Sequence, residues 1–189
     1  MSDHLFAQPE PSPAVFSLTQ IRHLMRVEFN RAQRYKYPLS CIVLACDRIG
    51  HLRDLYGYEF REAVVDEVVE LLQRTTRGCD YLGRMMDDRL MAILPHTSKE
   101  GAIASAERLL GMARELEFTP DGNPIQVTLS IGISHFENDN TMFFDSLVDE
   151  AEAGVREAAA AGGDRWVYRS PAPPSAGEVS ATPPSRSGS

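Results

Sequence analysis

The sequence predicts an α/β fold of the α+β sandwich type: a ferredoxin-like or palm-type mixed sheet of about five strands flanked by helices. Two observations predict this class. Helical and strand-like patterns alternate along the chain, and one pair of strands is separated by only a tight turn. The tight turn argues against a fully parallel sheet, because parallel neighbours need a long crossover connection. A length of 189 residues suits one domain with tails.

The first half of the folded region supplies two helices around a buried strand. Over residues 17–37 apolar side chains recur at helical spacing, and Pro38 ends this helix. Residues 40–47 form a short apolar run that is typical of a buried strand. Residues 60–77 are again helical, with valines and leucines on one side and acidic residues on the other.

A hairpin opens the second half. Residues 80–85 and 90–94 are predicted as its two strands, and Asp87 and Asp88 as the polar residues of its turn. The alternative role for these two carboxylates is a lone metal site, but we favour the turn because aspartate is a common turn residue.

The remaining elements complete the alternation. Ser98 is a suitable N-cap for a helix that runs to about residue 116, and residues 125–136 are strand-like. Residues 143–161 form a helix that ends at two glycines, and residues 165–168 form a last short strand. Five strand-like segments therefore alternate with four helices.

Composition excludes several classes of protein. The net charge of −8 argues against broad nucleic-acid binding, which needs a basic face. The longest apolar run, residues 41–46, is far shorter than the ~20 residues that span a membrane, so we expect no membrane insertion. The N-terminus lacks a signal-peptide pattern, and the 3 cysteines are too few for a disulfide framework. We therefore expect a reduced, cytoplasmic protein.

Both ends of the chain are rich in proline. Residues 1–15 and 170–189 hold 8 of the 12 prolines, and the second segment is also rich in serine. Such segments bury too little apolar surface to offset the entropy lost on ordering. We expect both to be disordered, so that residues 16–169 form the domain.

Several short motifs follow one another in a fixed order over residues 24–168. They are Arg31-Ala32-Gln33-Arg34-Tyr35, Pro38-Leu39, Tyr56-Gly57, Met86-Asp87-Asp88-Arg89-Leu90, Ala106-Glu107-Arg108 and the strand Val127–Ser134. In order and spacing they resemble the GGDEF family, the diguanylate cyclases that make cyclic di-GMP from two GTP molecules. The resemblance implies the GGDEF-domain architecture and a role in bacterial signal transduction.

The same resemblance implies that catalytic residues are missing. Ala45 stands where the family has a metal-binding Asp, Gly50 where it has a Lys, and Ala159 where it has a phosphate-holding Lys. Arg53 and Glu62 stand where the family reads guanine. They could pair with each other or contact a nucleotide, and we favour the surface pair.

The signature segment is degenerate as well. Met86 and Asp87 replace the two glycines that let substrate approach the backbone. Asp88 keeps one carboxylate, Arg89 reverses the charge of the next, and Leu90 takes the place of Phe. Two Mg²⁺ ions need several carboxylate oxygens to neutralise a triphosphate. We therefore expect no catalytic residue, no metal, no cofactor and no enzyme activity.

A second site of the family is expected to be intact. Arg77 and Asp80 have the Arg-x-x-Asp spacing of the family's inhibitory site, which binds the product, and Arg108 matches its additional arginine. Guanidinium groups fit phosphate and the guanine edge, and a carboxylate accepts from the guanine N–H groups. We expect these three residues to converge beside the hairpin. The alternative is a structural ion pair, because Arg-x-x-Asp is common by chance.

The leading hypothesis is a catalytically inactive GGDEF-like domain that acts as a cyclic di-GMP receptor. Its output is expected to be a protein–protein interaction, with an unidentified protein or with a second copy in a homodimer. The first alternative is a ligand-independent scaffold or dimerisation module with the same fold. The second is a divergent nucleotide cyclase.

Overall fold

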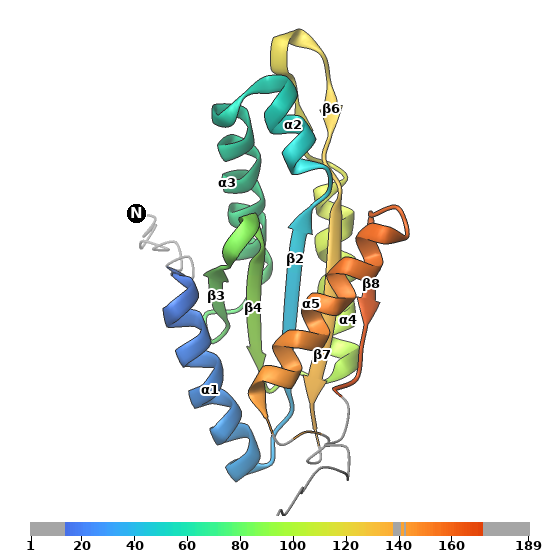
Figure 1. The fold of residues 1–189 in the computed structure, drawn as a ribbon. Helices are drawn as coiled ribbons and strands as arrows, with labels where there is room; N and C mark the ends of the chain where they lie inside the picture. Colours follow the sequence, from blue (N-terminus) through green and yellow to red (C-terminus); the bar gives the residue numbers. More distant parts are fainter. Residues whose placement is uncertain (1–13, 138–140, 142, 172–189) are drawn as a thin grey trace, which may run out of the picture.

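The computed structural model describes residues 14–137, 141 and 143–171. Its main sheet contains, from one edge to the other, β1 (Val15–Phe16), β3 (Tyr81–Arg84), β4 (Leu90–Pro95), β2 (Leu39–Cys46), β7 (Leu129–Phe136) and β8 (Arg165–Tyr168). The helices are α1 (Leu18–Tyr35), α2 (Ile49–Tyr56), α3 (Tyr58–Thr75), α4 (Lys99–Ala113) and α5 (Phe144–Ala160). Helices α1 and α5 cover one face of the sheet, and α3 and α4 cover the other (Figure 1).

The sheet is mixed, as the sequence predicts. The central strand β2 is antiparallel to both β4 and β7, and β3 is antiparallel to β4. The two outer pairs, β1–β3 and β7–β8, are parallel. The connection from β7 to β8 runs through α5, which provides the long crossover that a parallel pair needs.

Strand β2 separates two hydrophobic cores. Cys41 and Val43 face the layer of α1 and α5, whereas Ile42 and Leu44 face the layer of α3 and α4. This alternation follows from the two-residue period of a strand. The cysteines at 41 and 46 are buried, and burial raises the pKa of both thiols to about 12. They are therefore core residues, as the apolar run around them predicts.

Helix α1 is fixed to the domain along its length. Its N-cap is Ser17, which forms a capping box with Gln20. Ile21, Met25 and Phe29 are buried against the sheet at the spacing of helical turns. The apolar stripe of the predicted N-terminal helix is thus covered by its own domain.

Helix α5 approaches β7 so closely that glycine is required at the contact. A Cβ atom on Gly132 would lie 1.8 Å from the carbonyl oxygen of Ala151 and 2.6 Å from the backbone nitrogen of Val155. These are backbone atoms of a regular helix, which cannot move aside as a flexible side chain can. Gly132 of the predicted strand therefore allows α5 to lie this close to the sheet.

Three features differ from the prediction. The sheet has six strands rather than about five, because β1 adds a two-residue strand at the edge beside β3. Helix α2 occupies a segment for which the pattern predicts no helix. The strand predicted over 125–136 is split: β6 (Ile125–Gln126) pairs with β5 (Glu117–Phe118) in a separate two-stranded sheet.

The split in that strand coincides with a cluster around Asp47. The Asp47 carboxylate accepts hydrogen bonds from Thr128 Oγ1 at 2.7 Å, from Ser130 Oγ at 2.6 Å and from the backbone N–H of Asp164 at 2.9 Å. Its own N–H donates to the Thr128 carbonyl at 2.9 Å. Asp47 therefore joins the end of β2 to the start of β7 and to the loop before β8.

The predicted disordered ends, 1–15 and 170–189, lie mostly outside the described residues. Within the described part, Val15 pairs with Leu82 and Pro171 is buried. The domain limits of 16–169 stay a prediction. No helix within the described residues is long and apolar enough to cross a membrane.

Candidate functional site

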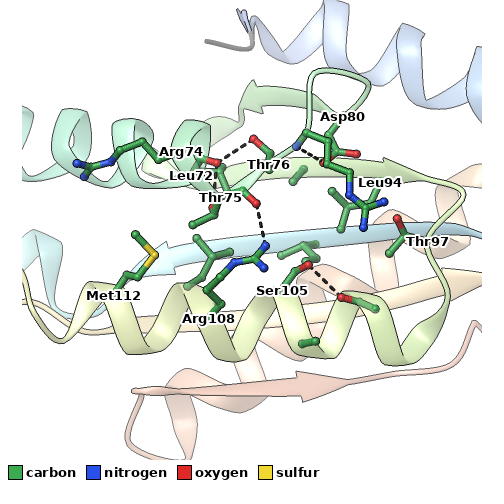
Figure 2. A pocket seen from close by; sticks show the side chains of 16 residues that line it. Leu72, Arg74, Thr75, Thr76, Asp80, Leu94, Thr97, Ser105, Arg108 and Met112 are labelled. Carbon is green, nitrogen blue, oxygen red and sulfur yellow. Dashed lines mark hydrogen bonds between the residues drawn. The ribbon is translucent and has the colours of Figure 1, made fainter. Parts of the chain in front are cut away.

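A pocket of about 550 Å³ lies where the end of α3, the turn before β3, strand β4 and helix α4 meet (Figure 2). Arg77, Asp80 and Arg108 all line it. Arg77 and Asp80 come from the turn, and Arg108 comes from the middle of α4. The fold thus brings these three residues to one pocket, beside strand β3 of the hairpin.

The turn that carries Arg77 and Asp80 is closed by its own hydrogen bonds. The backbone N–H of Arg77 donates to Asp80 Oδ2 at 2.7 Å, and the N–H of Asp80 donates to the Arg77 carbonyl at 3.0 Å. Asp80 is only 8% exposed, and burial raises the pKa of its carboxyl group, while the bond from Arg77 opposes the rise. The carboxyl group is therefore held in a fixed position at the wall of the pocket.

The two arginines differ in how they are held. Arg108 Nη2 donates to the Thr75 carbonyl at the end of α3, at 2.9 Å, which leaves four of its five N–H donors for other groups. Within the described part of the chain, the exposed guanidinium of Arg77 forms no hydrogen bond or ion pair. Arg108 is thus positioned by a hydrogen bond, whereas the Arg77 guanidinium has none among the described residues.

The segment Met86–Leu90, which the family resemblance matches to the signature, is engaged in ion pairs. Asp88 pairs with Arg61 of α3, and Arg61 in turn lies 4.8 Å from the centre of the Tyr58 ring. Arg89 pairs with Glu152 of α5 at 3.2 Å. The carboxylate that survives in the signature is therefore neutralised by an arginine of its own chain.

The strand beside the signature supplies no acidic group. The register that pairs Leu44 with Leu90 brings Ala45 next to Arg89 on the neighbouring strand. No group of three or more potential metal ligands occurs among the residues that the structure describes. Ala45 thus offers a methyl group, and Arg89 a guanidinium, where the family resemblance expects carboxylates.

The turn between the hairpin strands has the polar character that was predicted for it. Met86–Asp88 form a short 3₁₀ segment, in which Asp87 and Asp88 both adopt positive φ, at 57° and 60°. Aspartate tolerates this left-handed conformation better than most residues. Met86 is 66% exposed at the surface of the turn.

One predicted ion pair is wrong. Arg53 pairs with its neighbour Asp54 at 2.8 Å, and Glu62 pairs with its neighbour Arg61. Each residue therefore finds a partner within its own helix. Ala159 is exposed near the end of α5, and its side chain has no polar atom to offer.

A sequence profile described as "Diguanylate cyclase, GGDEF domain" matches residues 16–165. The chain belongs to the GGDEF family. A curated relative, diguanylate cyclase A of Treponema denticola, is 29% identical over 145 residues, which cover 77% of this chain and 38% of that protein. This GGDEF chain therefore spans less than half the length of that relative.

Solved GGDEF structures share the fold. Diguanylate cyclase SiaD of Pseudomonas aeruginosa, solved in complex with its activator SiaC, has a TM-score of 0.76 and 22% identity, covering 85% of this chain and 61% of that one. The GGDEF domain of DgcB from Caulobacter crescentus, solved in complex with c-di-GMP, has a TM-score of 0.76 and 12% identity, covering 87% and 98%. At such identities the likeness establishes the architecture, including the mixed sheet between two helical layers.

The sequence does not predict Arg61 or Arg74 as residues of these sites. Arg61 pairs with a residue 27 positions away, a contact that no local pattern reveals. Arg74 lines the same pocket as Arg77 and Arg108. Its position in the last turn of α3, three residues before Arg77 in the chain, is the signal that could have identified it.

Proposed function

We propose that this GGDEF domain is catalytically inactive and serves as a receptor for cyclic di-GMP, which it binds through Arg77, Asp80 and Arg108. The observation that carries the proposal is that these three side chains line one pocket. The two arginines suit the phosphates of the ligand, because guanidinium groups bind them in a bidentate manner. The carboxylate suits the N–H edge of a guanine.

The case for inactivity rests on the side chains of Ala45, Asp88 and Arg89, which stand where the family resemblance places catalytic residues. Phosphoryl transfer between two GTP molecules needs metal ions to neutralise the triphosphates. Ala45 has no oxygen ligand, Asp88 is paired with Arg61, and Arg89 adds a positive charge. A metal ion would have to displace Arg61, and no group of three or more potential ligands occurs among the described residues.

The output of such a receptor is proposed to be a contact with another protein. SiaD, which shares this fold, was solved in complex with a protein activator, which supports a protein partner as a class. A second copy of this chain is the other candidate. Light scattering of the pure protein with and without cyclic di-GMP separates them, because a ligand-induced doubling of mass requires a second copy.

The alternative function, a ligand-independent scaffold, is favoured by one observation. Asp80 already accepts a hydrogen bond from the backbone N–H of Arg77 within its own turn, so the aspartate has a structural use that needs no ligand. A scaffold needs the fold and the turn but no ligand in the pocket.

Calorimetric titration of the pure protein with cyclic di-GMP tests the proposal. The expected result is saturable binding, with no heat from GTP and Mg²⁺ in a parallel titration. A long incubation with GTP and Mg²⁺ or Mn²⁺ should yield no cyclic di-GMP by chromatography. Absence of binding at tens of micromolar would favour the scaffold, and turnover above a heat-killed control that is lost in Asp88→Ala would favour a divergent cyclase.

A further inference from the structure

The pocket is longer than the site formed by Arg77, Asp80 and Arg108. Figure 2 shows Asp80 and Thr97 toward one end, Arg108 between, and Arg74 and Met112 toward the other. Met112 follows Arg108 on α4 by four residues, about 6 Å along the helix axis. The end that Arg74 and Met112 border therefore lies on the other side of Arg108 from Asp80 (Figure 2).

The Arg74 guanidinium is available to a ligand. Its side chain is 57% exposed, and its ion pair with Glu67 has an N–O distance of 3.7 Å. Among the described residues, Glu67 is its one ion-pair partner. Exposed pairs at such a distance contribute little free energy, so a ligand can displace the carboxylate.

The wall beside Arg74 is apolar. Met112 is half-buried, and the buried side chains of Leu72 and Leu109 line the same pocket. The Arg74 guanidinium is directed back along α3 toward Glu67, and once released from that pair it can turn over this wall. A planar guanidinium there suits a flat aromatic ring, because guanidinium planes stack on bases and thioethers contact ring edges favourably. A phosphate would gain from the single charge but would leave the apolar wall unused.

We infer that the end of the pocket between Arg74 and Met112 is a second subsite, which takes a guanine base of the ligand. The inference rests on the proposed function, since it supposes that cyclic di-GMP enters this pocket. Asp80 reads one guanine at the first end, Arg77 and Arg108 hold phosphate, and the second guanine stacks against Arg74 over Met112. The pocket is then selective for a ligand with two bases.

Titration calorimetry with cyclic di-GMP on a set of variants tests this. Arg74→Ala should weaken binding by about 5- to 140-fold, the range for loss of one stacking partner. Arg74→Lys should weaken it nearly as much, because lysine keeps the charge but has no plane. Met112→Ala should weaken binding by about two- to tenfold, whereas Met112→Leu, which conserves volume, should bind nearly as the wild type does.

The matched control is Arg26→Ala. Arg26 is an exposed arginine on α1, on the opposite face of the sheet, and its loss should leave the affinity unchanged. Thermal melts should show that the Arg74 variants fold as the wild type does, since the side chain is exposed.

The outcomes separate the inference from the proposed function. Wild-type affinity in Arg74→Lys would mean that Arg74 acts through charge on a phosphate, which overturns the base subsite. Wild-type affinity in both Arg74→Ala and Met112→Ala, with binding lost in Arg77→Ala, would overturn the subsite and leave the receptor function standing. Absence of wild-type binding would overturn both.

Discussion

Replacement of Arg77 by alanine should reduce the affinity for cyclic di-GMP more than any other single change in the turn. In the free protein its guanidinium has no hydrogen-bond partner among the described residues, so all of its donors are available to the ligand. Truncation leaves a ligand phosphate without its partner, at a cost of about 2–4 kcal/mol. This corresponds to about 30- to 1000-fold in affinity.

The stability of the free protein should respond differently. Because the Arg77 side chain forms no hydrogen bond or ion pair with the described residues, its loss should leave the melting temperature nearly unchanged. Arg108→Ala removes one exposed hydrogen bond to the Thr75 carbonyl, which is worth about 1 kcal/mol or less. For a domain of this size that lowers the melting temperature by about 2–4 °C at most. A loss of affinity in either variant therefore cannot be attributed to unfolding.

Calorimetry and thermal melts with ligand measure the effect in two independent ways. Ligand at 100 times its dissociation constant stabilises the folded state by about 2.7 kcal/mol, which raises the melting temperature by about 5–11 °C. The wild type and the control Arg26→Ala should show this rise, and Arg77→Ala should not at the same concentration. Equal rises in all three proteins would show that the ligand binds elsewhere.

Three further predictions concern the fold and the charge of the site. Asp47→Ala should lower the free energy of unfolding in urea by about 2–4 kcal/mol, because three donors lose their acceptor. A smaller loss of unfolding free energy in Asp47→Ala than in Asp47→Asn would contradict this. Gly132→Ala should lower the free energy of unfolding by about 3 kcal/mol or more, because its Cβ would lie 1.8 Å from the carbonyl oxygen of Ala151. The control Gly111→Ala, at a position with open space around it, should not lower this free energy. Burial raises the pKa of Asp80, so the stability that its protonated form contributes is lost as pH rises through that pKa. The stability of Asp80→Asn relative to the wild type should therefore increase from pH 4 to pH 7 in urea denaturation, and a constant difference would refute the assignment.

Local patterns predict most of the regular structure. The apolar run of β2, the helical stripe of α1 and the N-cap at Ser98 depend on residues close together in the chain, and the structure has each of them. The absence of a carboxylate at Ala45 is likewise a property of a single position. Such features follow from the periods of helix and strand and from side-chain chemistry alone.

Short elements escape prediction for a physical reason. Strand β1 has two residues and helix α2 has eight, too few to establish a period. Their conformation is stabilised by neighbours: β1 exists because β3 offers an open edge. Such segments acquire their structure only when the rest of the sheet has formed.

The α/β class, most of the helical and strand segments and the Arg-x-x-Asp spacing of Arg77 and Asp80 can be predicted from the amino-acid sequence alone. The tertiary structure decided which distant groups meet. Arg108 reaches the pocket because α3 and α4 pack on the same face of the sheet, and Arg61 neutralises Asp88 across a separation of 27 residues. Contacts of this kind depend on how layers are stacked, and no local period encodes the distance between side chains on different elements.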